Sequence, residues 1–325
     1  MKVAQITVEM IRALRERTGA GMMDVKRALE QAGGNEEEAI RILRERGLAQ
    51  AAKRAGRAAL EGLVEAFVAE DRRSGALVEV NCETDFVART DSVRALARAV
   101  ARLAAESGIP EGVAAAGEAG RWDPRGEDSL ARVEALLQHP LPGFEGRSAF
   151  EAVAEVAGKV GEHVRVRRFA TFRTEGILDA YVHGDGRIGV LIDVEVEPRL
   201  AGERPEIRAL IRDLAMQVAA FRAEYVERSQ IPQAVVQREQ EIYRAAARNE
   251  GKPERVLDKI VAGRVEKFYQ EVCLVDQPFM RDAAISVGRH VEQVTAPLGA
   301  RLRVRRFARF ERAERLAGEG ERGEE

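Results

Sequence analysis

An internal duplication constrains the fold of this chain more than any other feature of its sequence. Residues 61–80 (EGLVEAFVAEDRRSGALVEV) align without a gap with residues 175–194 (EGILDAYVHGDGRIGVLIDV), at a shift of 114 positions. Residues 160–172 (VGEHVRVRRFATF) align with residues 298–310 (LGARLRVRRFARF) at a shift of 138. Because the shift grows between the two pairs, the second copy must carry extra residues between its central helix and its last strand.

Each copy has the same order of predicted elements: strand, hairpin, strand, helix, insertion, helix, strand. Runs of alternating valine with turn glycines predict the strands, and apolar spacings of three and four predict the helices. We therefore expect an α+β protein with two duplicated α/β sandwich core subdomains, each a small antiparallel sheet covered by helices. The predicted bounds are 61–173 for the first subdomain, and 174–230 with 273–311 for the second.

The two insertions differ in character. Residues 120–148 are rich in glycine and proline around one short helix, whereas residues 231–272 contain two long amphipathic segments. Pro232 is tolerated at the start of the first of these segments, and NEGKP (249–253) breaks the helical pattern. We expect the second insertion to form a protruding antiparallel helical hairpin, a coiled-coil arm.

The N-terminal residues 1–52 predict a compact three-helix module of the ubiquitin-associated type. Thr7, Asp24 and Asn35 are placed to cap its three helices, and Gly19 follows the first helix as a stop. A linker of residues 53–60 should join the module to the core, and residues 312–325 should form a tail. These six units complete the predicted domain organisation.

Composition excludes several classes of protein. The 325 residues carry a formal net charge of −2, which argues against a dedicated nucleic-acid binder. Cys82 and Cys273 lack CxxC spacing, so neither a disulfide framework nor a zinc site is indicated. No apolar run approaches the roughly 20 residues that a membrane helix needs. We expect a soluble, cytoplasmic protein with no cofactor and no metal.

Motifs that suggest catalysis have simpler explanations. GDGRIG (184–189) matches GxGxxG, but it runs into a strand instead of opening a helix, so it predicts a hairpin turn. The four histidines have no metal-ligand spacing, and no enzyme class is indicated. The repeated RVRRF (165–169 and 303–307) is typical of a half-buried strand with a solvated arginine face. Its alternative function is RNA binding.

Residues 81–90 (NCETDFVART) place one aromatic side chain, Phe86, in a strand-to-helix turn. Phe86 either caps the core or points outward into a partner, and the residues alone leave both readings open. The second copy has Leu200 at the aligned position, which favours a role outside the shared framework. Met22 and Met23 pose the same choice between core filling and a partner surface. For that pair we expect one side chain inside and one outside.

Four stretches of the chain together resemble the bacterial elongation factor Ts family. The resemblance covers nearly the whole chain in the expected order. The stretches are LRERTGAGMMDVKRAL (14–29), EVNCETDFVA (79–88), HGDGRIGVL (183–191) and GKPERVLDKIVAGRVEKFYQEVCLVDQPF (251–279). The resemblance implies a guanine nucleotide exchange factor for elongation factor Tu (EF-Tu), which is not an enzyme in the strict sense and binds no nucleotide itself.

The same resemblance implies three sets of partner-binding residues. One set displaces Mg²⁺ from EF-Tu, one belongs to the N-terminal module, and one belongs to the second core subdomain. In that order they are Thr84, Asp85, Phe86 and Val87; Leu14, Met22 and Met23; and Gln217, Val218 and Ala219. A homodimer or a 2:2 complex with EF-Tu is left open. Neither a membrane nor nucleic acid is an expected partner.

One segment departs from the family pattern, because MQVAA (216–220) has Gln217 where many members have histidine. The alternative function is an RNA- or ribosome-binding protein that uses the basic RVRRF strands. That alternative predicts RNA binding that weakens steeply with salt.

Overall fold

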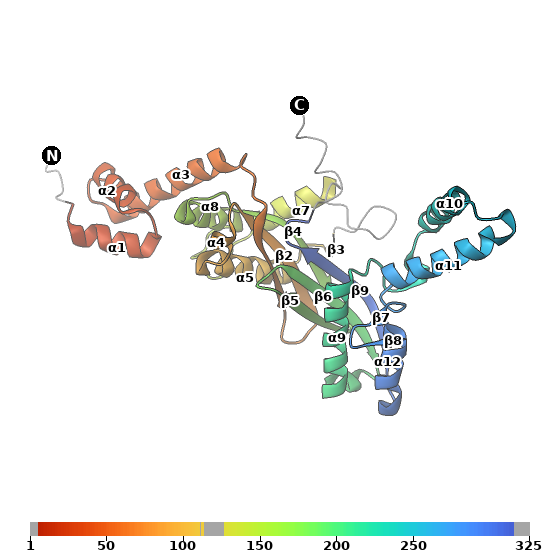
Figure 1. Ribbon diagram of the computed structural model, residues 1–325. Helices are drawn as coiled ribbons and strands as arrows, with labels where there is room; N and C mark the ends of the chain where they lie inside the picture. Colours follow the sequence, from red (N-terminus) through yellow and green to blue (C-terminus); the bar gives the residue numbers. More distant parts are fainter. Residues whose placement is uncertain (1–5, 111, 114–126, 315–325) are drawn as a thin grey trace.

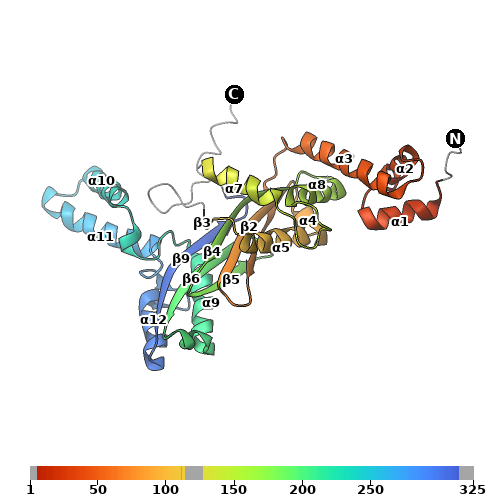
Figure 2. The same ribbon diagram turned by 180° about the vertical axis from the view of Figure 1, so that it is seen from behind.

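The computed structural model describes residues 6–110, 112–113 and 127–314 of the chain (Figure 1). Its N-terminal helices lie at one end of an elongated molecule and a helical hairpin lies at the other, with two sheets between them (Figures 1 and 2). The α+β fold class predicted from the sequence is confirmed. The predicted unit boundaries stay a prediction. Part of the 120–148 insertion and residues 315–325 of the tail lie outside the described residues.

The N-terminal module consists of helices α1 (Val8–Thr18), α2 (Met22–Gln31) and α3 (Glu36–Arg54). Two predicted caps are confirmed: the Thr7 side chain accepts a hydrogen bond from the Met10 N–H, and the Asn35 side chain accepts one from the Glu38 N–H. The predicted Asp24 cap is wrong. Helix α2 begins at Met22, with Gly21 as its N-cap residue, so Asp24 lies in its first turn and stabilises the positive end of the helix dipole.

The first core unit contains a four-stranded antiparallel sheet in the order β1-β2-β4-β3. Its elements are β1 (Glu61–Val68), β2 (Ser74–Cys82), α4 (Asp85–Ala88), α5 (Asp91–Glu106), β3 (Gly112–Val113), α7 (Glu127–Gln138), α8 (Ala149–Val160) and β4 (Arg165–Arg173). Apart from the short β3 and α4, and α7, which lies in the 120–148 insertion, this is the predicted order.

The second core unit repeats that arrangement as a three-stranded sheet in the order β5-β6-β9. Its elements are β5 (Ile177–His183), β6 (Ile188–Glu197), η1 (Arg199–Glu203), α9 (Pro205–Phe221), η2 (Arg228–Gln230), α10 (Gln233–Asn249), α11 (Glu254–Val272), β7 (Pro278–Phe279), β8 (Asp282–Ser286), α12 (Val287–Thr295), η3 (Ala296–Leu298) and β9 (Arg301–Glu311). GDGRIG is the β5–β6 turn, as predicted. Helices α10 and α11 form the predicted hairpin.

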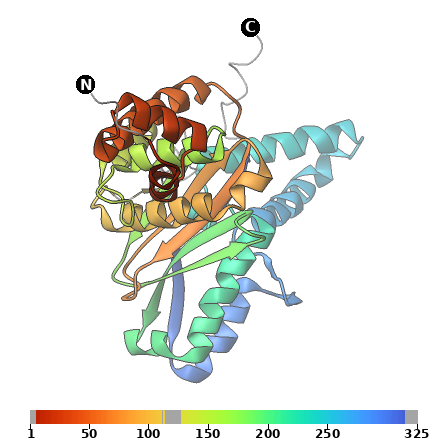
Figure 3. The ribbon, with the colours of Figure 1, turned by 90° about the vertical axis from the view of Figure 1, so that its left-hand side faces the viewer.

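The two sheets pack face to face, and helices cover their outer faces (Figure 3). Helices α5 and α8 pack on the first sheet, and α9 and α12 pack on the second. A third apolar cluster between the sheets contains only strand residues, among them Val64, Leu77, Phe172, Leu191 and Phe310. Strands β2 and β6 are therefore buried on both faces, which explains their nearly continuous apolar sequence.

The contact between the sheets has approximate two-fold symmetry. Arg168 lies over the Phe310 ring at 4.1 Å, and its duplicate Arg306 lies over the Phe172 ring at 4.4 Å. Arg168 also donates to the Glu311 carbonyl oxygen, and Arg306 donates to the Arg173 carbonyl oxygen. Each half thus makes the same contacts to the other half, as the subunits of a two-fold dimer do.

The duplicated glycines Gly75 and Gly189 let the two sheets approach each other. A Cβ atom at Gly189 would lie 2.5 Å from Val64 Cγ1 and 2.7 Å from Leu77 Cδ1. At Gly75 the nearest side-chain atom, Leu191 Cδ1, would lie 3.2 Å away. The space between the sheets therefore has less room for a methyl group at Gly189 than at Gly75.

We predict that Gly189→Ala destabilises the protein by about 1–3 kcal/mol, because the added methyl group overpacks the space between the sheets. Gly75→Ala serves as the matched control and should cost less. Urea unfolding followed by circular dichroism measures both changes. A larger loss at Gly75 than at Gly189 would contradict this account of the sheet contact.

Candidate functional site

Among the aromatic side chains in the part of the chain that the structure describes, Phe86 is the most exposed, with 80% of its surface accessible. It lies on the four-residue helix α4 between β2 and α5. Its neighbour Val87 packs partly against the core of the first unit, and Ala88 is buried in it. The helix is therefore attached to the core by the residues after Phe86, and Phe86 itself projects into solvent. The reading of Phe86 as a core cap is excluded.

Local hydrogen bonds define the turn that carries Phe86. The Thr84 side chain accepts from the Val87 N–H at 3.4 Å and so caps α4. Asp85 forms an ion pair with Arg89 at 3.2 Å, one helical turn later. The Cys82 thiol donates to the Thr84 carbonyl oxygen at 3.1 Å. Burial raises the pKa of Cys82 to about 12, which keeps it a neutral thiol with a structural role.

The equivalent tip of the second copy is also apolar and exposed. Leu200 lies in the 3₁₀ helix η1 with 85% of its surface accessible. Alignment of the copies located this residue, but its exposure could not be read from the sequence. The two tips differ in chemistry: Phe86 follows the acidic Asp85, and Leu200 follows the basic Arg199. Only the first tip presents an aromatic ring beside a carboxylate.

In the N-terminal module the structure separates the three predicted binding residues. Leu14 is fully buried among the three helices, so the prediction that its side chain binds a partner is wrong. Met22 and Met23 are both exposed, at 51% and 59%, so the expectation that one points inward is wrong as well. The two methionines open α2, and the core below them is filled by later residues of that helix. Val8, which sequence analysis missed, is also exposed.

The three residues predicted in the second subdomain are buried in α9. Val218 and Ala219 belong to the core of the second unit. The Gln217 Nε2 donates to the Pro278 carbonyl oxygen at 3.1 Å, and its Oε1 accepts from the Met280 N–H at 2.8 Å. The direct partner contact predicted for Gln217, Val218 and Ala219 is therefore corrected: their side chains hold the helix and the β7–β8 hairpin in place.

Two of the three arginines of RVRRF in the first copy are not solvated, contrary to expectation, whereas Arg165 is exposed. Arg167 and Arg168 are buried, and both donate to the carboxylate of Glu79, at 3.0 and 2.6 Å. The alternation of valine and arginine along β4 was interpreted as one solvated face of the strand. In the structure the second sheet and residues 311–314 cover that face. These two arginines are therefore unavailable to a phosphate backbone.

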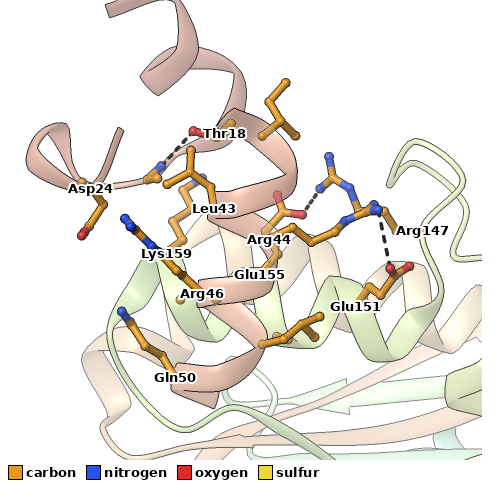
Figure 4. A pocket seen from close by; sticks show the side chains of 17 residues that line it. Thr18, Asp24, Leu43, Arg44, Arg46, Gln50, Arg147, Glu151, Glu155 and Lys159 are labelled. Carbon is orange, nitrogen blue, oxygen red and sulfur yellow. Dashed lines mark hydrogen bonds and ion pairs between the residues drawn. The ribbon is translucent and has the colours of Figure 1, made fainter. Parts of the chain in front are cut away.

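A pocket lies between the N-terminal module and α8 (Figure 4). Helix α3 approaches α8 closely at Gly47 and Gly158. Arg44 forms an ion pair with Glu151 at 3.6 Å, and Arg147 pairs with Glu155. The first pair joins the module to the core, and the second lies within the core beside it. The pocket therefore marks the contact between α3 and α8.

Within the described part of the chain, no group of three or more His, Cys, Asp or Glu side chains is arranged to hold a metal ion. None of the helices in that part is long and apolar enough to cross a membrane.

Comparison with known proteins agrees with the motifs and the fold. The model of the family described as elongation factor TS matches residues 83–314. Elongation factor Ts of Clostridium tetani is 40% identical over 310 residues, which cover 95% of this chain and 94% of that protein. Elongation factor Ts of Symbiobacterium thermophilum is 41% identical over 314 residues, which cover 96% and 93%. The chain therefore belongs to the elongation factor Ts family.

Proposed function

We propose that this protein is a guanine nucleotide exchange factor for EF-Tu, the GTPase of translation elongation, and that it acts in the cytoplasm. Membership of the elongation factor Ts family supports the proposal. The observation that carries it is the exposed Phe86 on a short helix that is attached firmly to the core. An aromatic ring projecting from a rigid support is a suitable anchor for a pocket in a partner.

Exchange follows from the coupling of two binding equilibria. GDP is held in its GTPase largely because Mg²⁺ and backbone amides neutralise the phosphates. A factor that binds the nucleotide-free GTPase more tightly than the nucleotide-bound form must weaken nucleotide binding by the same ratio. A newly bound GTP then expels the factor. The protein forms and breaks no covalent bond, so it is not an enzyme in the strict sense.

In our proposal, Phe86 enters a pocket in the GTPase domain and disturbs the Mg²⁺ and phosphate site. Asp85 lies beside it and adds a negative charge close to that site. Thr84 and Val87 support Phe86 without contacting EF-Tu, since Thr84 caps the helix and Val87 packs on the core. The family motif therefore combines two residues that contact the partner with two that support them.

Met22 and Met23 provide a second contact in this proposal, because they are exposed and adjacent on the module. Replacing both with alanine should raise the half-saturating concentration of the factor at least about tenfold, because each change removes a methylene worth roughly 0.8 kcal/mol when buried, together with the thioether end. The melting temperature should not change, since both side chains are exposed. Titration of exchange rates measures the effect. An unchanged half-saturating concentration would show that the two methionines do not contact EF-Tu.

The alternative function, RNA or ribosome binding through RVRRF, loses support because Arg167 and Arg168 are buried and paired with Glu79. Arg303 and Arg305 of the second copy remain on the surface side of β9, but they bring no stacking aromatic with them.

Release of fluorescent GDP from EF-Tu of the same organism tests the proposal. The protein should accelerate release in a saturable way, and excess GTP should dissociate the complex that forms. A parallel measurement with single-stranded and ribosomal RNA addresses the alternative. Tight, salt-dependent RNA binding without any acceleration of GDP release would replace the proposal with the alternative.

A further inference from the structure

The turn that carries Phe86 and the loop that follows α8 hold each other by reciprocal hydrogen bonds. The N–H groups of Glu83 and Thr84 donate to Glu162 Oε2 at 3.1 and 3.0 Å. The Thr84 hydroxyl donates to Glu162 Oε1 at 2.7 Å. In return, Glu83 Oε1 accepts from the His163 N–H at 2.7 Å. One carboxylate from each loop therefore binds the backbone of the other.

A third segment, the chain that leaves α3, joins this arrangement. Arg57 Nη1 donates to Glu83 Oε1 at 3.4 Å, and His163 Nδ1 lies 2.8 Å from the Arg57 carbonyl oxygen. The carbonyl only accepts, so Nδ1 carries the proton. The His163 N–H lowers the pKa of Glu83, as does the Arg57 charge, which keeps Glu83 ionised. We name Glu83, Glu162 and His163 the turn clamp.

Thr84 connects the turn clamp to the helix that carries Phe86. Its hydroxyl proton points to Glu162, so an oxygen lone pair remains to accept from the Val87 N–H and start α4. A carboxylate at position 162 thereby orients the hydroxyl that caps the helix on which Phe86 stands. The connection runs from Glu162 through Thr84 to the backbone of Phe86, without touching the ring itself.

The duplication provides an internal control for the role of the clamp. At the positions equivalent to Glu162, Thr84 and His163, the second copy has Ala300, Pro198 and Arg301. Its three main strands nevertheless pair in the same order, β5-β6-β9 against β1-β2-β4, and its helices α9 and α12 follow the order of α5 and α8. The shared fold therefore forms without the clamp. The clamp occurs only in the copy whose tip carries the aromatic ring.

We propose that Glu162 is a positioning residue for nucleotide exchange, which holds the Thr84–Val87 turn so that Phe86 is presented in its binding orientation. This inference rests on the proposed function. An anchor that is held in place before binding loses less conformational entropy when it enters a pocket. Without Glu162, two backbone N–H groups and the capping hydroxyl lose their acceptor, and the turn gains freedom at the point where Phe86 leaves the core.

The test compares Glu162→Ala, Glu162→Gln and the parent chain in release of fluorescent GDP from EF-Tu. Glu162→Ala should lower kcat/KM for release by about tenfold, as expected for a lost hydrogen bond to a charged group. Glu162→Gln should stay within about threefold, because its amide oxygen can accept the two N–H bonds and its amide nitrogen can donate to Thr84. Equal losses in both variants would overturn the proposal.

A double-mutant cycle separates positioning from general support of the fold. If Glu162 acts through Phe86, then Glu162→Ala should change exchange by less than about twofold in a Phe86→Ala background. An undiminished tenfold effect in that background would overturn the proposal. Glu175→Gln, which removes an exposed carboxylate elsewhere on the core, is the matched control and should behave like the parent.

Amide hydrogen exchange of the free chain tests the clamp without EF-Tu. In Glu162→Ala, protection should fall at residues 83–88 and stay unchanged in β2 and α5, at a melting temperature close to that of the parent. Unchanged protection at 83–88 would overturn the proposal. If the parent chain did not accelerate GDP release from EF-Tu, the proposed function would be wrong, and the hydrogen-exchange result alone would then test the turn clamp.

Discussion

Replacing Phe86 with alanine should lower the acceleration of GDP release by about ten- to a hundredfold. Burial of one phenylalanine side chain contributes roughly 1.5–3 kcal/mol, and about 1.4 kcal/mol corresponds to a factor of ten. The ring is 80% exposed in the free chain, so its removal costs the fold little. The loss should therefore appear in exchange kinetics and be absent from the melting temperature.

Leu200→Ala is the matched control for Phe86→Ala, since it removes an equally exposed apolar side chain from the equivalent tip of the second copy. It should leave GDP release within about twofold of the parent, because no large apolar surface is lost from the Phe86 contact. If Phe86→Ala accelerated GDP release from EF-Tu as much as the parent does, the exposed ring would have no part in exchange. A loss in Leu200→Ala as large as that in Phe86→Ala would show that both tips bind.

The framework of the fold could be predicted because the duplication repeats a pattern that sequence periodicity reads well. The alternation in strands depends on neighbours only a few positions away, and so do capping residues such as Thr7 and Asn35. Both can therefore be predicted without knowing the tertiary structure. The change of shift from 114 to 138 also indicated extra residues between the helix and the last strand of the second copy, where helices α10 and α11 lie. The local sequence pattern could not predict which face of each strand packs against another sheet.

That missing information explains the errors. Arg167 was expected in solvent because it alternates with apolar residues, yet its side chain is 7% exposed and bonded to Glu79 and to the Glu314 carbonyl oxygen. Leu14 and Gln217 were assigned to a partner by resemblance to a family motif, and the structure buries both. For Phe86 the sequence left two readings open, and only its exposure decided between them. The turn clamp was missed because Glu83 and Glu162 are far apart in sequence, so no local pattern links them.

The second large effect concerns the buried ion pair between the strands. Glu79 is fully buried, and its carboxylate accepts from Arg168 at 2.6 Å, Arg167 at 3.0 Å and Asn81 at 3.0 Å. Glu79→Ala would leave two buried guanidinium groups without this carboxylate. Breaking a buried pair from one side costs about 3–5 kcal/mol. We expect that loss in the free energy of unfolding, measured by urea denaturation.

The duplicate pair, Asp193 with Arg306 at 2.9 Å, provides the control. The Arg306 side chain is 38% exposed, whereas that of Arg168 is 2% exposed. Water can therefore solvate Arg306 when its partner is removed, and Asp193→Ala should cost about 1–2 kcal/mol. An equal cost for Glu79→Ala and Asp193→Ala would mean that burial does not decide the energy of these pairs.

The pH dependence of unfolding gives the same pair an independent test. Burial raises the pKa of Glu79, but the Arg168 and Arg167 charges and the Asn81 hydrogen bond outweigh it, so the net pKa is lowered. A lowered folded-state pKa contributes stability that is present above the unfolded value of about 4.3 and is lost as pH falls through the folded value. Glu79→Gln cannot titrate at this position, so its stability should fall less steeply below about pH 4.3 than that of the parent. Identical slopes in the parent and Glu79→Gln would contradict a lowered pKa at Glu79.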